Sequence, residues 1–246
     1  MKIIGIDLAW QSENNTTALA IGILSGREFH ISKIHNSLDS LNAIKDAIDN
    51  EDKVQGLSID APLIIKNDTG QRKCEHELSQ VYGSRYASCH ASNTTLYPNS
   101  ASTTLSNYLL NSKFKHLGNP EEDQWQIECY PHPALIEIFA LSERLPYKKG
   151  SVIDRKNGQI RLANLLKSLS NSNFLTLTLD DSCNFYLDET HILSQAGKSL
   201  KQNEDALDSI ICAYIGALYG SRTPHHTFGN IESGYIYVPK QRCINP

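Results

Sequence analysis

Five acidic residues carry the clearest chemical signal of the sequence: Asp7, Asp60, Glu128, Asp205 and Asp208. Asp7 and Asp60 lie within the apolar runs GIDLAW and SIDAPL. A carboxylate in such a run is costly unless it is paired, bound to a metal ion or placed at the solvated end of a strand. Mg²⁺ and Mn²⁺ prefer oxygen ligands, and two such ions about 4 Å apart can activate water and stabilise the leaving oxygen of a phosphodiester. We therefore expect the five acids to converge on one divalent-metal site.

The expected strands present their acids in a regular way. Side chains alternate between the two faces of a strand, so Gly5 and Asp7 share one face of a strand at residues 3–10. A strand at residues 54–61 places Ser58 and Asp60 on one face in the same manner. Glu128, in a strand at residues 124–130, is a third carboxylate of this candidate set.

A helix at residues 204–219, with Asn203 as its N-cap, supplies the remaining acids. Steps of 100° place Asp205 and Asp208 opposite an apolar face. A flank of small residues, which includes Ala213 and Gly216, lets this helix approach a sheet closely. Asp205 in a first turn has a second explanation, because an acid there stabilises the helix dipole by about 0.3–1 kcal/mol.

The elements that must position these acids form one α/β domain over residues 1–246, with a polar insertion at residues 62–122. An antiparallel meander opens the chain, and a helix and a fourth strand follow it. Pro133 stands at the first position of the helix after residue 130. The expected strands cover residues 3–10, 17–24, 28–34, 54–61, 124–130, 174–179 and 235–238. The expected helices cover residues 38–48, 72–80, 103–114, 134–143, 154–169, 189–199 and 204–219.

Composition excludes several classes of protein. Hydrophobic residues make up 40% and charged residues 20% of the chain, which is typical of a globular protein. No run approaches the roughly 18 apolar residues of a membrane span, so we expect no membrane contact. The net charge of −4 gives no general attraction to a phosphate backbone and argues against duplex binding, although local basic patches remain compatible with it.

The cysteines favour a reducing compartment. Six of them are spread at long spacings, so we expect free thiols and a cytoplasmic protein. Cys74, His76, Cys89 and His90 do not have the spacing of a standard zinc finger. The six are Cys74, Cys89, Cys129, Cys183, Cys212 and Cys243.

Ordered blocks along most of the chain resemble a known family. The blocks GIDLAW, SIDAPL, RKCEHEL, IECYPHPALIEIF, LPYKKG and EDALDSIICAY resemble the domain of unknown function 429, whose members are regarded as predicted ribonuclease-H-like nucleases. The strand aspartates and the closing helix are also similar to the site of Holliday-junction resolvases. This resemblance implies a mixed five-stranded sheet in the order β-β-β-α-β-α-β-α, and a two-metal nuclease that uses Mg²⁺ or Mn²⁺.

The resemblance also implies roles for individual residues. Asp7 and Asp60 would be metal ligands, and Asp205 or Asp208 would complete the site. Glu128 would either join them or position the turn at residues 130–133. Loops of the 62–122 insertion would contact the substrate.

Four further residues are candidates for substrate binding. Arg72 either pairs with Glu75 or reaches the scissile phosphate. Lys148 and Lys149 either form a solvated loop or bind the phosphate backbone. His132 either caps a helix or acts as a general acid or base, because histidine titrates near neutrality.

Three functions are compatible with this pattern. The leading hypothesis is a metal-dependent nuclease that hydrolyses phosphodiester bonds of DNA or RNA. The second is a catalytically inactive ribonuclease-H-like protein that binds nucleic acid or protein. The third is an actin-like ATPase, but that fold needs two copies of the core and glycine-rich phosphate loops, whereas LAWQ follows Asp7 here.

Overall fold

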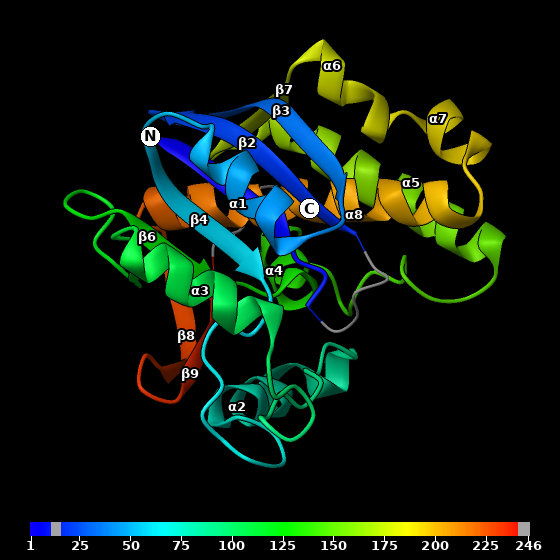
Figure 1. The fold of residues 1–246 in the computed structure, drawn as a ribbon. Coiled ribbons are helices and arrows are strands. Elements are labelled where there is room, and N and C mark those ends of the chain that lie inside the picture. Colours follow the sequence, from blue (N-terminus) through cyan, green and yellow to red (C-terminus); the bar gives the residue numbers. More distant parts are fainter. Residues whose placement is uncertain (11–15, 241–246) are drawn as a thin grey trace.

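The computed structural model describes residues 1–10 and 16–240 and has an α/β fold (Figure 1). Its strands are β1 (Lys2–Asp7), β2 (Thr17–Ser25), β3 (Glu28–Leu38), β4 (Val54–Asp60), β5 (Lys115–His116), β6 (Trp125–Glu128), β7 (Thr176–Leu179), β8 (His225–Asn230) and β9 (Gly234–Pro239). Within the described residues, seven strands form one mixed sheet in the order β5-β6-β4-β1-β2-β3-β7. β2 is antiparallel to β1 and β3, and the other neighbours are parallel. β8 and β9 form a separate two-stranded sheet.

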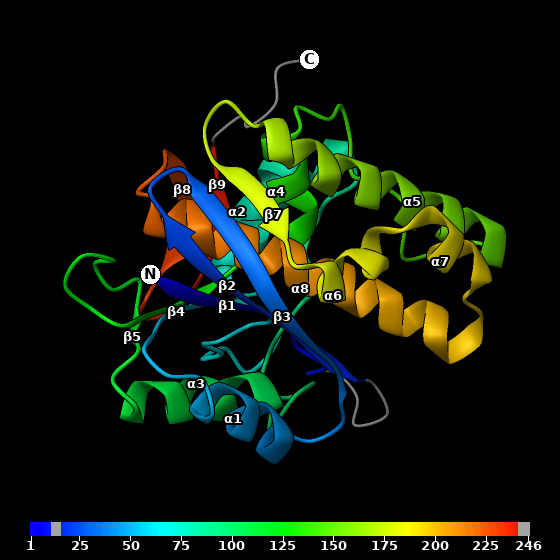
Figure 2. The same cartoon turned by 90° about the horizontal axis from the view of Figure 1, so that it is seen from above.

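Helices connect these strands and cover both faces of the large sheet. The α-helices are α1 (Leu41–Asp49), α2 (Lys73–Tyr82), α3 (Ala101–Asn111), α4 (Pro131–Ile138), α5 (Val152–Ser168), α6 (Asp181–Asn184), α7 (Glu189–Ser194) and α8 (Gly197–Gly220). Short 3-10 turns are η1 (Gly83–Arg85), η2 (Leu169–Asn171) and η3 (Phe185–Leu187). The long helix α8, orange in Figure 2, lies against one face, and α1 and α3 lie together on the other.

Two apolar clusters fill the two sides of the sheet. On the α8 side, Ile3 of β1 and Ile127 of β6 belong to a core that includes most of α8. On the opposite side, Ile4 and Ile6 of β1 pack with residues of α1 and α3. The alternation of side chains along β1 therefore assigns odd-numbered residues to the α8 face.

Small residues bring α8 unusually close to the sheet. A Cβ atom built on Gly5 would lie 2.0 Å from the backbone nitrogen of Ala213, and one built on Gly216 would lie 3.0 Å from the Cβ of Ser58. The structure therefore confirms the expectation that this flank of α8 approaches the sheet. The close approach brings the acids of α8 near the ends of β1 and β4.

The order of elements agrees with the expectation over the first half of the chain. The antiparallel meander, the following helix and the fourth strand are all present. The insertion at residues 62–122 contains α2, η1, α3 and β5. The sheet has seven strands where the resemblance implied five, because the two-residue β5 and the edge strand β7 extend it on either side.

The largest differences from the expected helices are at three places, and smaller shifts include α1, which begins at Leu41 because Leu38 belongs to β3. α8 begins at Gly197, so Asn203 lies inside the helix and its side-chain nitrogen donates to Gln159 instead of capping. The helix expected at residues 189–199 is two helices, because the chain is extended at Gln195 and Ala196. α4 begins at Pro131 and ends at Ile138, so Pro131 takes the first helical position expected for Pro133.

No helix among the described residues is long and apolar enough to serve as a membrane span.

The small β8–β9 sheet packs with α2 and α4. Phe228, Ile236 and Val238 of the sheet share an apolar cluster with Leu78 of α2 and Ile136 of α4. The insertion is thereby attached to the rest of the molecule through the last strands of the chain.

Candidate active site

A cavity of about 690 Å³ opens where β1 and β4 end. Asp7 and Asp60 line it from the sheet, and Lys201 and Asp205 line it from α8. The insertion and the loop at residues 144–149 supply much of the remaining wall. This size is typical of small-ligand sites in proteins.

Asp7 and Asp60 are neighbours at the carboxyl ends of two parallel strands. They are directly paired in the register of β1 and β4. Both side chains lie on the α8 face of the sheet. Asp7 is on the same face of β1 as Gly5, and Asp60 is on the same face of β4 as Ser58. Gly5 and Ser58 both contact α8. Within the described residues, neither carboxylate has a hydrogen-bond or ion-pair partner.

The electrostatic state of this pair follows from its surroundings. Burial raises the pKa of Asp7 well above its usual value, and Asp208, Asp205 and Asp60 raise it further, against the opposing effect of Lys148. Burial also raises the pKa of Asp60 to about 7; Lys148 opposes this shift and Asp208 adds to it. Two adjacent carboxylates withdrawn from water repel each other, and a bound cation would relieve that repulsion.

Asp205 and Asp208 lie on the first half of α8 and are almost fully buried. The Lys201 ammonium contacts Asp205 at 2.7 Å, and the hydroxyl of Thr16 donates to the same carboxylate at 3.2 Å. The Lys148 ammonium contacts Asp208 at 2.8 Å, and the hydroxyl of Tyr147 donates to it at 2.6 Å. Since α8 begins eight residues before Asp205, the helix dipole does not explain this acid.

The donor set fits a hard divalent cation in its chemistry. Among residues 1–10 and 16–240, no three His, Cys, Asp or Glu side chains are arranged to hold an ion as they stand. Asp7 and Asp60 nevertheless offer adjacent unpaired carboxylates, which are ligands that Mg²⁺ and Mn²⁺ prefer. Asp205 and Asp208 could bind the ion only if it displaced the lysine ammonium that each carboxylate contacts.

Glu128 is held apart from the other acids. It pairs with Ile59 in the register of β4 and β6, so it lies on the face opposite Asp7 and Asp60. Its carboxylate accepts from the guanidinium of Arg72 through both oxygens, at 2.5 and 2.9 Å, and from the backbone of Leu63 at 2.9 Å. Glu128 therefore joins the insertion to β6 instead of completing the aspartate cluster.

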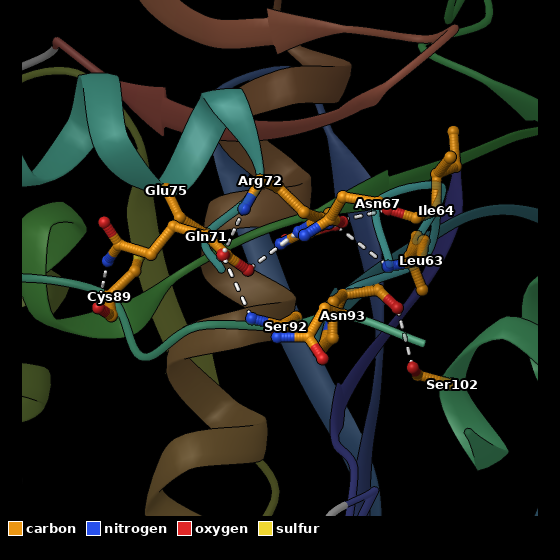
Figure 3. Close-up of polar contacts among 12 residues, drawn as sticks. Leu63, Ile64, Asn67, Gln71, Arg72, Glu75, Cys89, Ser92, Asn93 and Ser102 are labelled. Atoms are coloured by element: carbon orange, nitrogen blue, oxygen red, sulfur yellow. Dashed lines mark hydrogen bonds and ion pairs between the residues drawn. The ribbon is translucent and has the colours of Figure 1, made fainter. Parts of the chain in front are cut away.

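Arg72 is a buried structural residue in this arrangement. It is 3% exposed, and its guanidinium also donates to Glu75 at 2.7 Å and to the carbonyl of Ile64 at 3.0 Å. Figure 3 shows Arg72 between Glu75 and Ile64, with the backbone of Ser92 donating to Glu75. The pairing of Arg72 with Glu75 expected as one alternative is present, and four of the five guanidinium N–H groups donate within this cluster.

His132 lies beside the aspartate cluster without capping a helix. It is the second residue of α4, and its ring packs against those of Tyr130 and Tyr147. Its Nδ1 is buried and has no hydrogen-bond partner among the described residues. Burial, with Lys148 as the next cause, lowers the pKa of His132 to about 3, so the ring is neutral at pH 7.

The two lysines of the expected substrate set have different environments. Lys148 is partly buried and is held by Asp208, and its charge opposes those of Asp7 and Asp60. Lys149 is exposed, lines the cavity and has no partner within the described chain. Of these two lysines, Lys149 is therefore the one whose ammonium forms no ion pair within the described residues.

Sequence reasoning missed Lys201, Tyr147 and Thr16. Lys201 lies four residues before Asp205, a spacing at which helix side chains meet, but the expected helix began after it. Tyr147 directly precedes Lys148, and nothing in its spacing indicates a contact with Asp208. Thr16 is the residue before β2 and reaches α8 only through the tertiary fold.

The cysteines of the described residues are free thiols, as expected. Cys243 lies outside the described residues. Burial raises the pKa of both Cys74 and Cys89, which keeps these thiols protonated. Cys74, His76, Cys89 and His90 do not form a metal-binding group.

Comparisons with known proteins give one match. A family model described as "Protein of unknown function (DUF429)" matches residues 5–227, which is most of the chain. No curated protein and no solved structure matches the chain.

Proposed function

The chain belongs to the DUF429 family, and we propose that it is a divalent-metal-dependent nuclease that hydrolyses phosphodiester bonds of DNA or RNA. The observation that carries this proposal is the pair Asp7 and Asp60. They stand side by side at the ends of parallel strands, border a cavity, and have no partner within the described residues. Both side chains are partly buried. Adjacent carboxylates partly withdrawn from water and without a cation are costly, and a functional cation is the simplest compensation.

The order of elements supports a ribonuclease-H-like core. β1, β2, β3, α1, β4, α3, β6 and α8 follow the order that the family resemblance implies, with β5 and β7 as additions at the sheet edges. In the ribonuclease-H-like nucleases that the sequence resembles, the strand aspartates and the acids of the closing helix form the site. Asp7, Asp60, Asp205 and Asp208 have these positions here.

Each residue of the site has a part in the proposed reaction. Mg²⁺ or Mn²⁺ held by Asp7 and Asp60, as one ion or as a pair with Asp205 or Asp208, would supply Lewis-acid chemistry for water attack on phosphorus. Lys148 would neutralise charge that develops on the phosphate, because its ammonium already lies among the acids. Tyr147 orients Asp208 by its hydrogen bond, and Lys201 holds Asp205.

Cleavage with a matched variant tests this proposal. The purified chain should cleave an oligonucleotide with Mn²⁺ and not with EDTA, and Asp7→Asn should remove the activity. Asp46→Asn, an exposed change on α1, should leave it intact. Absence of cleavage of single-stranded and duplex DNA and RNA by the wild-type chain would contradict the proposal.

The alternative of an inactive binding protein rests on the lysines. Lys148 and Lys201 already pair with two of the four aspartates, so the chain carries part of its own counter-charge. If the chain is an inactive binding protein, Mn²⁺ would not change its thermal stability, and no nucleic acid would be cleaved. Asp7 and Asp60 favour the nuclease, because neither carboxylate has an ion pair within residues 1–10 and 16–240.

A further inference from the structure

We propose that the cavity receives an unpaired nucleotide of single-stranded nucleic acid, with Tyr86 as the surface on which its base stacks. Arg144 and Lys149 would contact the flanking phosphates. This inference rests on the proposed nuclease function and names its class of substrate. Tyr86, Arg144 and Lys149 line the same cavity as the aspartates.

Tyr86 is held in a conformation that favours glycine. It follows η1 with φ 60° and ψ 20°, in the left-handed region, where a side chain such as tyrosine is rarely found. Its side chain is 64% exposed and borders the cavity. Within the described chain the ring has no hydrogen-bond or aromatic partner. The left-handed turn ends η1, because the backbone nitrogens of Tyr86 and Ala87 donate to the carbonyls of Gly83 and Tyr82. This turn accounts for the backbone but not for the exposed ring beside the cavity, which has the form of a ligand contact.

Two unpaired cations border the same cavity. Arg144 and Lys149 line the cavity, and neither side chain has a partner among the described residues. The backbone nitrogen of Arg144 donates to the carbonyl of Arg85 at 3.0 Å, and the side chain of Arg85 donates to the carbonyl of Ser142 at 3.0 Å. These bonds fix the 144–149 loop beside the turn that carries Tyr86.

The distribution of charge and aromatic surface favours a single strand over a duplex. A base can stack on Tyr86 only when it is out of a helix, and stacking tolerates any sequence. The net charge of −4 gives no broad basic surface for a duplex backbone, whereas two local cations suffice for the phosphates beside one nucleotide. The aspartates lie inside a cavity, which an unpaired strand can enter more readily than a double helix.

Binding and stability measured together test this inference. Fluorescence anisotropy of the full chain in Ca²⁺, a cation that carboxylates also bind, would compare labelled DNA and RNA oligonucleotides as single strands and as duplexes. We expect the single strand to bind at least about 10-fold more tightly, and the DNA and RNA arms to identify which sugar is preferred.

Variants of Tyr86 separate a ligand contact from a structural residue. Tyr86→Gly should weaken single-strand binding about 10-fold while its melting temperature stays the same or rises, because glycine relieves the backbone strain. Tyr86→Phe should bind like the wild type. Phe185→Ala, a change at another exposed ring, should leave single-strand binding unchanged.

Two results would overturn the inference: equal binding of duplex and single strand, or unchanged single-strand binding by Tyr86→Gly. Cleavage in Mn²⁺ that depends on Asp7 but not on Tyr86 would overturn the substrate class and leave the nuclease proposal standing. Single-strand binding that depends on Tyr86, without cleavage of any nucleic acid, would refute the nuclease proposal and retain the ligand of the cavity.

Discussion

Two groups of acids, one buried and one partly buried, line one cavity and differ in how their charge is compensated. Glu75 and Glu128 surround the guanidinium of Arg72, which donates to both. Asp7 and Asp60 face α8 without a partner in the described chain. A fully paired cluster stabilises its surroundings, whereas an unpaired one persists at a cost and indicates a function.

The pKa values of the two groups show the same contrast. Although burial opposes its charge, Glu128 raises the pKa of Arg72, so the guanidinium remains charged at any pH of interest. Burial raises the pKa of Asp60 to about 7, which places its titration in the physiological range. Burial raises the pKa of Glu128 as well, but the charge and the hydrogen bonds of Arg72 oppose that shift. The first group therefore contains its own counter-charge, and the second can exchange protons or cations.

Removal of Arg72 should have the largest effect on folding. Arg72→Met would leave Glu75 and Glu128 buried without a cation, which typically costs about 3–5 kcal/mol. Urea denaturation would measure the loss. Arg222→Met, which breaks the exposed pair with Glu121, is the control and should cost less than about 1 kcal/mol. Equal losses from the two variants would contradict a structural role for the Arg72 cluster.

Removal of Asp7 should do the reverse, abolishing activity while the fold remains. Asp7→Asn removes one of two adjacent carboxylates, so the proposed Mn²⁺-dependent cleavage should fall by at least about 10²-fold, as expected when several kcal/mol of charge stabilisation is lost. Without divalent ions, its melting temperature should be equal to or above that of the wild type. A destabilisation like that of Arg72→Met would place Asp7 in the structural group.

The sequence was sufficient to identify the pair Asp7 and Asp60, but not the cluster around Arg72. Asp7 and Asp60 are conspicuous because each interrupts an apolar strand, and period-two alternation correctly paired them with Gly5 and Ser58. Alternation within β6 could not reveal that Glu128 faces the other side, because the face depends on the register between β4 and β6. The contact of Arg72 with Glu128 spans 56 residues and has no local signal.

Helix boundaries limited the prediction on α8. Asn203 followed by acids has the pattern of a helix start, but Gly197 begins the helix and Asn203 is buried against α5 through Gln159. Tertiary packing of this segment outweighed its local signal. The error concealed Lys201, which only a longer helix places one turn from Asp205.

Loss of the Asp60 charge should produce a pH-dependent gain in stability. The folded pKa of about 7 exceeds the usual 3.8, so the unfolded chain ionises first and the wild-type fold loses stability as pH rises from about 4 to about 7. Asp60→Asn removes this loss and should raise the free energy of unfolding above about pH 7 by roughly 2–4 kcal/mol, since each pKa unit corresponds to about 1.4 kcal/mol. The melting temperature of the variant, measured without divalent ions, should exceed that of the wild type more at pH 8 than at pH 5. A constant difference across this range would contradict the shift.

The smallest effect is expected at Lys201, which is 43% exposed at its side chain. Lys201→Ala should lower the free energy of unfolding by about 1–2 kcal/mol, less than Arg72→Met, because the half-exposed ammonium leaves two buried carboxylates, Glu204 and Asp205. It should tighten Mn²⁺ binding a few-fold, since the ammonium that competes for Asp205 is gone. Calorimetric titration of Mn²⁺ would measure this, with Lys198→Ala on the same helix as the control. Weaker Mn²⁺ binding would mean that Lys201 supports the site instead of competing for it.

The most direct test of the account is anomalous diffraction from crystals soaked in Mn²⁺. The account predicts manganese bound by the carboxylates of Asp7 and Asp60, on the face of the sheet that α8 covers, with the Arg72 cluster unchanged. Crystals in which the pair binds no manganese, with Lys148 still on Asp208 and Lys201 still on Asp205, would contradict it.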